Sequence, residues 1–270
     1  MGPLNPIHFT PEQTAVMRQS FAAGTPCKHL IIDGFLTDET ANLLHGHFPP
    51  MSALKVRRKS LNENKAEDYK FNEWHPAFSE VRNAIRSESF AAWISTVTGI
   101  DGLLTPDNPL GSGVHQGANG SYVDVHVDVN YDPESNLWRR VNLLIYLNRN
   151  WKDEYGGHLE IWDKFMKRAE KRIAPAHNRA VLFLTDENSP HGYQTIQVPE
   201  GETRKSFYAY FFTPIQDGFR YSDSRFIARP DDSAWRKAAT SIKESVKINF
   251  KRLLKVLGVK SLDFQDKNKY

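Results

Sequence analysis

The sequence predicts an α+β fold with a mainly β core, helices before the core and a helix after it. Two central segments, 121–130 and 204–212, alternate apolar and polar residues as strands with one buried face do. Capping residues and helical spacing mark earlier segments, and a lysine-rich periodic segment follows at 233–258. We expect one integrated domain in three parts: a helix-rich support region at 1–105, the β core at 106–222 and a basic helical extension at 223–270.

The first helix has a clear start signal. Thr10 is an N-cap candidate, Pro11 suits the first helical position and Gln13 completes a capping box. These residues predict a helix that runs through Phe21.

Three further segments complete the support region. KHLIIDGFL at 28–36 is typical of a buried strand, and Thr37 then opens the next helix. Segment 76–99 has apolar residues three and four apart and ends on a glycine suited to a helix C-cap. Segment 54–70 is polar and includes KVRRK, so we expect a solvated loop near the mouth of the β core, with a lid as the alternative.

The most informative segment is SYVDVHVDVN at 121–130. Residues two apart project to the same side of a strand, about 6.6 Å apart. His126 and Asp128 therefore share a face with Asp124, while valines occupy the other face. Polar side chains directed into a barrel need partners or a function. One strand can thus supply two metal ligands, and a second strand must supply the third.

A distant histidine, His191 in SPHGYQTI, is the candidate third ligand. Two imidazoles and one carboxylate on one face of a metal are typical of non-haem Fe(II) oxygenases. Structural zinc sites usually use thiolates, and the only cysteine, Cys27, lies far upstream. A competing pair, His158 and Glu160, could also chelate a metal, but it follows a turn at 154–157 and is the weaker candidate.

Five ordered blocks between about Leu110 and Thr213 resemble the bacterial-type, prolyl-4-hydroxylase-like branch of the 2-oxoglutarate/Fe(II) dioxygenase superfamily. The blocks are GSGVHQGANGSYVDVHVDVN, RRVNLLIYLNRNW, YGGHLEIWD, NRAVLFLTDENSPHG and PEGETRKSFYAYFFT. The resemblance implies a double-stranded β-helix, or jelly roll, whose inner face carries the metal.

The resemblance also assigns roles to individual residues. His126, Asp128 and His191 match the iron triad, and Arg204 matches the residue that binds the distal carboxylate of 2-oxoglutarate. A guanidinium suits that role because its planar fork meets a carboxylate bidentately. Two further residues of the family pattern contact the same carboxylate, and they match Ser206 and Tyr146.

Other site residues stay open. His115 is placed near the co-substrate or the substrate, with a loop histidine as the alternative. Asn142 is expected to point inward, with hydrogen bonding within the sheet as the alternative. Lys205 competes with Arg204, because 13 residues separate His191 from Arg204, a longer spacing than in animal prolyl hydroxylases. Alternation favours Arg204. The pair at 139–140, two arginines, could guard an anionic substrate or lie in solvent at the strand entrance.

The implied activity is hydroxylation of an unactivated C–H bond in a prolyl residue, an amino acid or a small metabolite. The implied cofactors are Fe(II), 2-oxoglutarate and ascorbate, with O2 as oxidant and with succinate and CO2 released. Alternatives are a non-catalytic jelly-roll binding or sensor protein and a nucleic-acid or protein demethylase of the same superfamily.

Composition limits the remaining choices. A net charge of +3 is too small to indicate nucleic acid as a partner. The lone cysteine excludes an internal disulfide, and neither a signal peptide nor a membrane span is evident, so a cytoplasmic protein is expected. We expect the basic helix at 233–258 to pack on its own domain, with contact to a partner or an anionic membrane surface as the alternative.

Overall fold

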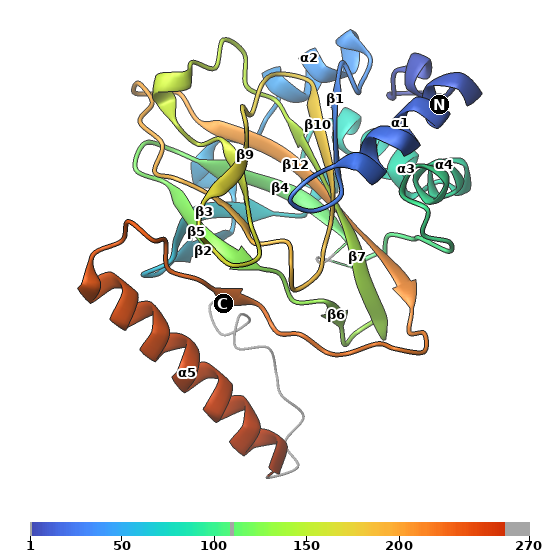
Figure 1. The fold of residues 1–270 in the computed structure, drawn as a ribbon. Helices are drawn as coiled ribbons and strands as arrows, with labels where there is room; N and C mark the ends of the chain where they lie inside the picture. The colour runs from blue at the N-terminus through green and yellow to red at the C-terminus, as the bar shows by residue number, and fades with distance from the viewer. Residues whose placement is uncertain (1, 109–110, 257–270) are drawn as a thin grey trace.

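A curled antiparallel sheet forms the centre of the structure, a computed structural model that describes residues 2–108 and 111–256 (Figure 1). Within those residues the sheet has thirteen strands. They are β1 (His29–Asp33), β2 (Val56–Lys59), β3 (Glu63–Asp68), β4 (Ser112–Gly117), β5 (Tyr122–Val127), β6 (Tyr131–Asp132), β7 (Leu137–Tyr146), β8 (Leu159–Trp162), β9 (Ala169–Ile173), β10 (Arg179–Leu184), β11 (His191–Tyr193), β12 (Arg204–Pro214) and β13 (Arg225–Phe226). The helices are α1 (Pro11–Ala23), α2 (Asp38–Gly46), α3 (Pro76–Arg86), α4 (Glu88–Thr98) and α5 (Ala234–Val256), with 3-10 helices η1 (Pro6–Phe9), η2 (Met51–Ala53), η3 (Phe71–Glu73) and η4 (Asp153–Tyr155).

Two groups of strands face each other because the sheet curls. The strand order is β1-β10-β7-β12-β4-β3-β5-β11-β8-β9, with β2, β6 and β13 paired to β3, β7 and β5. Strand β3 joins the groups, because Ala66–Asp68 pair with β4 whereas Glu63 and Asn64 pair with β5. A cavity between the groups is lined from both sides. This arrangement confirms the α+β class and the jelly-roll core.

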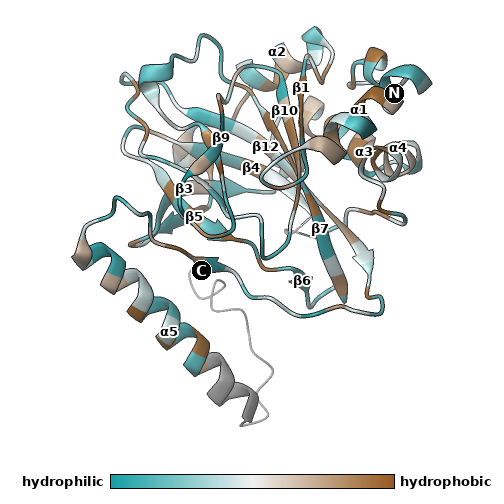
Figure 2. Cartoon of the chain, viewed as in Figure 1, coloured by the Kyte–Doolittle hydropathy of each residue, from teal (hydrophilic) through white to brown (hydrophobic). Residues whose placement is uncertain are grey.

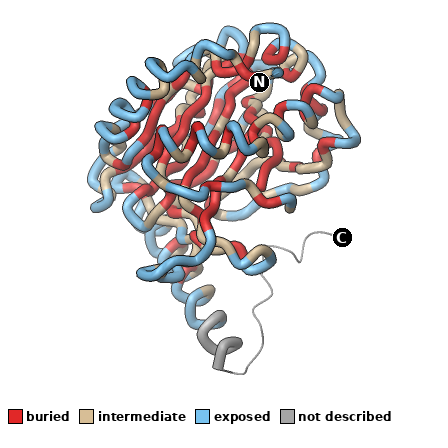
Figure 3. Tube along the Cα trace, turned by 90° about the vertical axis from the view of Figure 1, so that its right-hand side faces the viewer, coloured by how far each residue is buried: buried red, intermediate tan, exposed pale blue. Residues whose placement is uncertain are grey.

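The main apolar core lies between the sheet and helices α1 to α4. Phe90 on α4 contacts Phe35, Trp93 and Phe211, with ring centroids 5.1–6.3 Å apart. Burial is strongest along the strands, whereas the helices expose their outer turns (Figure 3). Hydrophobic residues accordingly concentrate around β1 and β10, beside these helices, whereas α5 carries only separate hydrophobic bands (Figure 2). The helices therefore brace one side of the sheet.

The predicted starts of the first two helices are confirmed. Thr10 caps α1, and its hydroxyl accepts a hydrogen bond from the Gln13 amide at 3.2 Å. Thr37 caps α2 in the same way through the Thr40 amide. The strand expected at 28–36 is shorter, because β1 ends at Asp33 and Gly34 turns the chain at a φ of 65°.

Two expectations for the support region are wrong. Segment 54–70 is not a solvated loop, because it forms the β2–β3 hairpin and β3 is inserted into the main sheet. Segment 76–99 is two helices, α3 and α4, because Ser87 between them has extended backbone with a ψ of 152°. Ser87 also caps α4, whose C-terminal Gly99 is left-handed as predicted.

The lysine-rich C-terminal segment is helical. Helix α5 begins at Ala234, close to the predicted start, and is described to Val256. The predicted end at Gly258 and the rest of the extension, 259–270, lie outside the described residues. Among the helices that the structure describes, none combines the length and the apolar character that crossing a bilayer requires.

We expect Ser87→Ala to lower the free energy of unfolding by about 1 kcal/mol, because the Phe90 amide loses its hydrogen-bond acceptor at the start of α4. A urea titration measures this change. Ser95→Ala, within the same helix, is the control and should have a smaller effect. Equal losses in the two variants would contradict the capping role.

Candidate metal and co-substrate site

His126, Asp128 and His191 lie together at the inner face of the sheet. His126 is on β5, Asp128 follows the end of that strand, and His191 begins β11, where it pairs directly with His126. One ligand atom from each residue lies within 4.8 Å of the others. The Nε2 atoms of His126 and His191 lie 3.5 Å from Asp128 Oδ1 and Oδ2, respectively.

Backbone carbonyls orient both imidazoles in the same way. The Nδ1 atom of His126 lies 3.0 Å from the carbonyl oxygen of Asp124, and that of His191 lies 3.0 Å from the carbonyl oxygen of Ser189. A carbonyl only accepts hydrogen bonds, so Nδ1 carries the proton in each ring. The Nε2 lone pairs are therefore directed toward the carboxylate, as metal-binding histidines require.

The carboxylate is held by two donors from β7. Arg139 Nη2 and Asn142 Nδ2 donate to Asp128 Oδ2 at 3.0 and 2.8 Å, and Arg139 Nε donates to Asn142 Oδ1 at 2.9 Å. Burial alone would raise the pKa of Asp128, but the Arg139 guanidinium holds this pKa well below its usual range. The carboxylate is therefore ionised, and Asn142, which we expected to point inward, does so.

The histidine on β11 is neutral. Burial, and then the neighbouring His126, lower the pKa of His191 to about 4. A neutral imidazole with a fixed tautomer can donate its lone pair to a metal. Two imidazoles and one carboxylate therefore form a donor set that suits a divalent transition metal with further positions open.

A small cavity of about 90 Å³ adjoins the triad. It is lined by side chains of both walls and by one glycine. They are Lys65, His115, Val123, His126, Asp128, Asn142, Leu144, Leu159, Phe183, His191, Gly192, Tyr193, Arg204, Ser206 and Tyr210. The cavity therefore brings the triad together with Arg204, Ser206 and His115.

Arg204 is a fixed cation on the cavity wall. Its Nε donates to the Gly157 carbonyl at 2.8 Å and its Nη2 to the Tyr146 hydroxyl at 3.3 Å. The guanidinium also lies over the rings of Tyr193 and Tyr146, at 4.1 and 4.9 Å from their centroids. Tyr146 is thus placed behind the guanidinium. Lys205 does not line the cavity, and its Nζ lies 3.5 Å from the Thr203 carbonyl.

Lys65 is a cavity residue that the sequence did not reveal, because its segment has the composition of a solvated loop. Its Nζ lies 3.2 Å from Glu67 Oε2 and 3.5 Å from His115 Nε2. Burial would lower the pKa of Lys65, but Glu67 raises it above its ordinary value. Burial and the Lys65 charge lower the pKa of His115 to about 4, although Glu67 opposes them.

A stack of rings connects His115 with the metal ligands. His115 stacks on Tyr208 at 4.3 Å, Tyr208 stacks on Tyr210 at 4.8 Å, and the Arg139 guanidinium lies 3.5 Å from the Tyr210 ring centroid. Arg139 in turn binds Asp128. Both tyrosines come from the face of β12 that also carries Arg204 and Ser206. The alternation of residues along this strand therefore predicts that the tyrosines point toward the site.

The competing chelating pair lies outside the triad. His158 Nε2 is 3.2 Å from Asp153 Oδ1. Glu160 is buried, where it accepts a hydrogen bond from Trp162 Nε1 at 3.0 Å and pairs with Arg229. Among the described residues, neither joins a group that could hold a metal. The second predicted arginine, Arg140, is half-buried with its guanidinium over the Trp138 ring.

Comparisons with known proteins agree with this geometry. Residues 112–212 match the family described as the 2OG-Fe(II) oxygenase superfamily. Over 195 residues the chain is 25% identical to mouse prolyl 3-hydroxylase OGFOD1. The matched stretch covers 70% of this chain and 33% of the relative. The chain therefore spans about a third of the length of that curated relative.

Solved structures show the same fold. A prolyl-4-hydroxylase from Pseudomonas putida has a TM-score of 0.55 at 17% identity, over 75% of this chain and 100% of that chain. A prolyl hydroxylase from Trichoplax adhaerens, in complex with a hypoxia inducible factor peptide fragment, has a TM-score of 0.54 at 16% identity. That match covers 74% of this chain and 90% of the other. These similarities support the jelly-roll assignment.

The pKa of His115 predicts a loss of stability in acid. Its pKa falls from 6.5 to about 4 on folding, so the unfolded chain binds a proton that the folded chain does not. The free energy of unfolding therefore decreases as the pH falls from about 6.5 toward 4.

In metal-free His115→Gln, we expect the decrease between about pH 7 and pH 5 to be smaller by roughly 1–2 kcal/mol. Urea titrations at both pH values measure it, with His47→Gln, an exposed site, as the control. Parallel pH curves for His115→Gln and the unsubstituted protein would refute the assignment.

Proposed function

We propose that this chain, whose residues 112–212 match the family described as the 2OG-Fe(II) oxygenase superfamily, is an Fe(II)- and 2-oxoglutarate-dependent hydroxylase. One observation carries the proposal: an oriented His-Asp-His triad and a fixed, buried guanidinium line the same cavity. A metal ligand set and an anchor for a dicarboxylate are the two requirements of this chemistry.

The triad fits Fe(II). His126 and His191 present Nε2 atoms and Asp128 presents its carboxylate, while Nδ1 of each histidine is engaged by a backbone carbonyl. Because Arg139 and Asn142 both donate to Asp128 Oδ2, Oδ1 keeps its lone pairs for the metal. Arg139 and Asn142 thus limit how the carboxylate can rotate.

The cavity wall fits 2-oxoglutarate. Arg204 would bind the distal carboxylate, because its guanidinium is already held in place and loses little freedom on binding. Ser206, two residues along β12, would add a hydroxyl contact, and Tyr146 would orient Arg204 from behind. Lys65 also lines the cavity, where it pairs with Glu67.

When bound, iron and 2-oxoglutarate supply the oxidising chemistry, in which O2 is consumed, succinate and CO2 are released, and a substrate C–H bond is hydroxylated. The protein contributes orientation and exclusion of water around the reacting atoms. Phe183, Leu144 and Leu159 provide the apolar part of the cavity wall that limits access of water.

The substrate class that we propose is a prolyl residue in a peptide or protein. Support comes from the relative named as a prolyl 3-hydroxylase, while a free amino acid or small metabolite is the second choice. Iron-loaded protein incubated with 2-oxoglutarate and a panel of prolyl peptides, amino acids and small metabolites tests this class. Hydroxylation of prolyl peptides, detected as a mass gain of one oxygen atom, is expected.

The same incubation, with a methylated protein and a methylated nucleic acid added to the panel, separates the alternatives. A binding or sensor protein would form no succinate with any member of the panel. A demethylase would release formaldehyde from a methylated protein or nucleic acid. Ascorbate as a further cofactor stays a prediction, which turnover with and without ascorbate checks.

We predict that His126→Ala, Asp128→Ala and His191→Ala each lose most bound iron, because each removes one of three ligands. His158→Ala is the matched control, since His158 contacts Asp153 away from the triad, and it should keep iron near the level of the unsubstituted protein. Metal analysis after anaerobic Fe(II) loading measures the content. Full iron retention without His126 or His191 would refute the triad.

We predict that Arg204→Ala weakens 2-oxoglutarate binding by roughly 1.5–3 kcal/mol, because a carboxylate loses its charge-assisted partner. Iron binding should change little, since Arg204 contacts Gly157 and Tyr146 rather than the triad. Anaerobic calorimetric titration of the iron-loaded protein with 2-oxoglutarate measures the co-substrate affinity, and a separate anaerobic titration of the metal-free protein with Fe(II) measures the iron affinity. Lys205→Ala is the neighbouring control, and a larger effect there would transfer the anchoring role to Lys205.

A further inference from the structure

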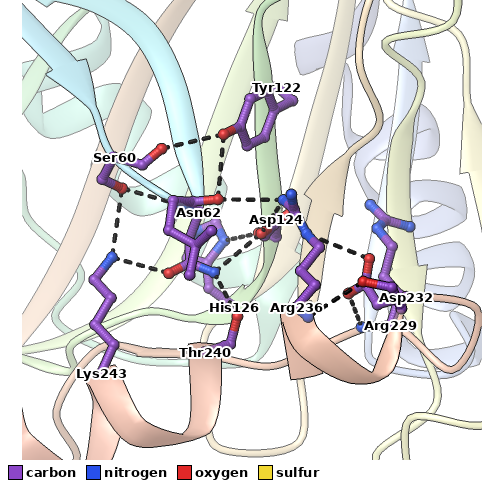
Figure 4. Close-up of polar contacts among 12 residues, drawn as sticks. Ser60, Asn62, Tyr122, Asp124, His126, Arg229, Asp232, Arg236, Thr240 and Lys243 are labelled. Carbon is purple, nitrogen blue, oxygen red and sulfur yellow. Dashed lines mark hydrogen bonds and ion pairs between the residues drawn. The ribbon is translucent and has the colours of Figure 1, made fainter. Parts of the chain in front are cut away.

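The C-terminal segment 225–244 crosses the part of the sheet that carries both histidines of the triad. Strands β5, β11 and β8 lie side by side in that order. Arg236 on α5 binds Asp124 of β5 with Nη2 at 2.9 and 2.8 Å from the two carboxylate oxygens (Figure 4). Arg229, before α5, pairs with Glu160 of β8. The two ion pairs therefore lie on either side of β11.

The pair at β5 is part of a larger polar junction. Asn62, in the β2–β3 turn, is fully buried and donates through Nδ2 to Asp124 Oδ2 and to Thr240 Oγ1, both at 3.0 Å. Lys243 Nζ donates to Asn62 Oδ1 at 2.9 Å (Figure 4). The backbone carbonyl of Asn62 also accepts the Asp124 amide at 2.7 Å. Helix α5, the hairpin and β5 are thus joined at one residue, Asp124.

Asp124 also orients a metal ligand. Its side chain binds Arg236, and its backbone carbonyl accepts the Nδ1 proton of His126. Phe226 of β13 pairs with His126 and places its ring 5.4 Å from the imidazole. The C-terminal segment therefore constrains His126 both through the peptide of Asp124 and by direct ring contact.

The pair at β8 acts on the neighbouring histidine. Glu160 pairs with Gly192, and the adjacent Ile161 pairs with His191. Glu160 and Arg229 are both almost fully buried, with side-chain exposures of 3% and 8%. Removing Arg229 would leave the buried Glu160 with the more distant Arg172, at 3.8 Å, as its cationic partner, so the pair favours the native position of β8.

We propose that the segment 225–244 is a staple that sets the positions of His126 and His191, with Arg236 and Arg229 as positioning residues. The staple lies outside the matched region 112–212. The proposal rests on the metal-binding role of the triad. It predicts that the C-terminal segment determines how tightly Fe(II) is held.

The test compares two Arg–Asp pairs of similar arginine exposure. Arg236 and Arg179 have side-chain exposures of 28% and 25%, and Arg179 joins Asp33 across β10 and β1, away from β5 and β11. Arg236→Met, Arg236→Lys and Arg179→Met are titrated anaerobically with Fe(II) alone. Thermal unfolding and hydrogen exchange of the β5 and β11 amides are measured in the metal-free proteins.

Arg236→Met should bind Fe(II) up to roughly tenfold more weakly, the lower end of the loss when a direct hydrogen-bond partner of a metal ligand is removed, because Arg236 acts on His126 through Asp124. Its β5 and β11 amides should exchange faster even without metal. Arg236→Lys should recover part of the affinity, because it retains a cation beside Asp124. Arg179→Met should retain the Fe(II) affinity whatever its loss of thermal stability.

Unchanged Fe(II) affinity in Arg236→Met, or an equal loss in Arg179→Met, overturns the staple. If Arg236→Met does not fold, Thr240→Val removes only the Asn62 to Thr240 contact and must show a smaller loss in the same direction. Failure of the unsubstituted protein to bind Fe(II) overturns the proposed function together with the staple. Iron binding that His126→Ala abolishes but Arg236→Met leaves intact overturns the staple alone.

Discussion

The direct pairing of His126 with His191 is the constraint on which the rest of the site depends. Antiparallel register between β5 and β11 places the two residues opposite each other, and a shift of one residue would turn one imidazole to the other face of the sheet. Each ring is then fixed by the carbonyl two residues earlier in its own chain segment. Asp128 completes the triad because it follows His126 by two residues on the same face. Strand geometry thus sets the ligand arrangement before any metal binds.

Charge around this triad is balanced in pairs. Asp128 faces Arg139, and Glu67 faces Lys65 and Arg58, so each buried carboxylate has a cationic partner at hydrogen-bond distance. Burying such groups without partners would cost several kcal/mol each. Arg204 differs, because its neighbours are a carbonyl and a phenol rather than a carboxylate. A cavity wall with one uncompensated guanidinium of this kind is prepared for an anionic ligand.

Much of this site could be predicted from the sequence, because alternation in a strand is a geometric rule. The faces assigned to His126, Asp128, Arg204 and Ser206 follow from it, and the cavity contains these four residues. The prediction that Asp124 shares this face is wrong, because the β5–β11 register shifts, Val123 lines the cavity and Asp124 binds Arg236 instead. Lys65 could not be found that way, because a charged hairpin has the composition of a solvated loop until its partners Glu67 and His115 are known. The break between α3 and α4 could not be predicted for a related reason. Apolar periodicity continues across Ser87, and only its capping hydrogen bond shows where one helix ends.

The junction at Asp124 joins residues that are far apart in the chain, since 62 residues separate it from Asn62 and 112 from Arg236. Synthesis on the ribosome proceeds from the N-terminus, so the hairpin and β5 emerge well before α5 does. Contacts between distant segments also form late in folding, because closing a long loop costs chain entropy. The strand that carries His126 is therefore complete as a polypeptide while the junction around it is still open. The residues that surround Asp124 thus come from segments made at different times, and α5 is the last of them.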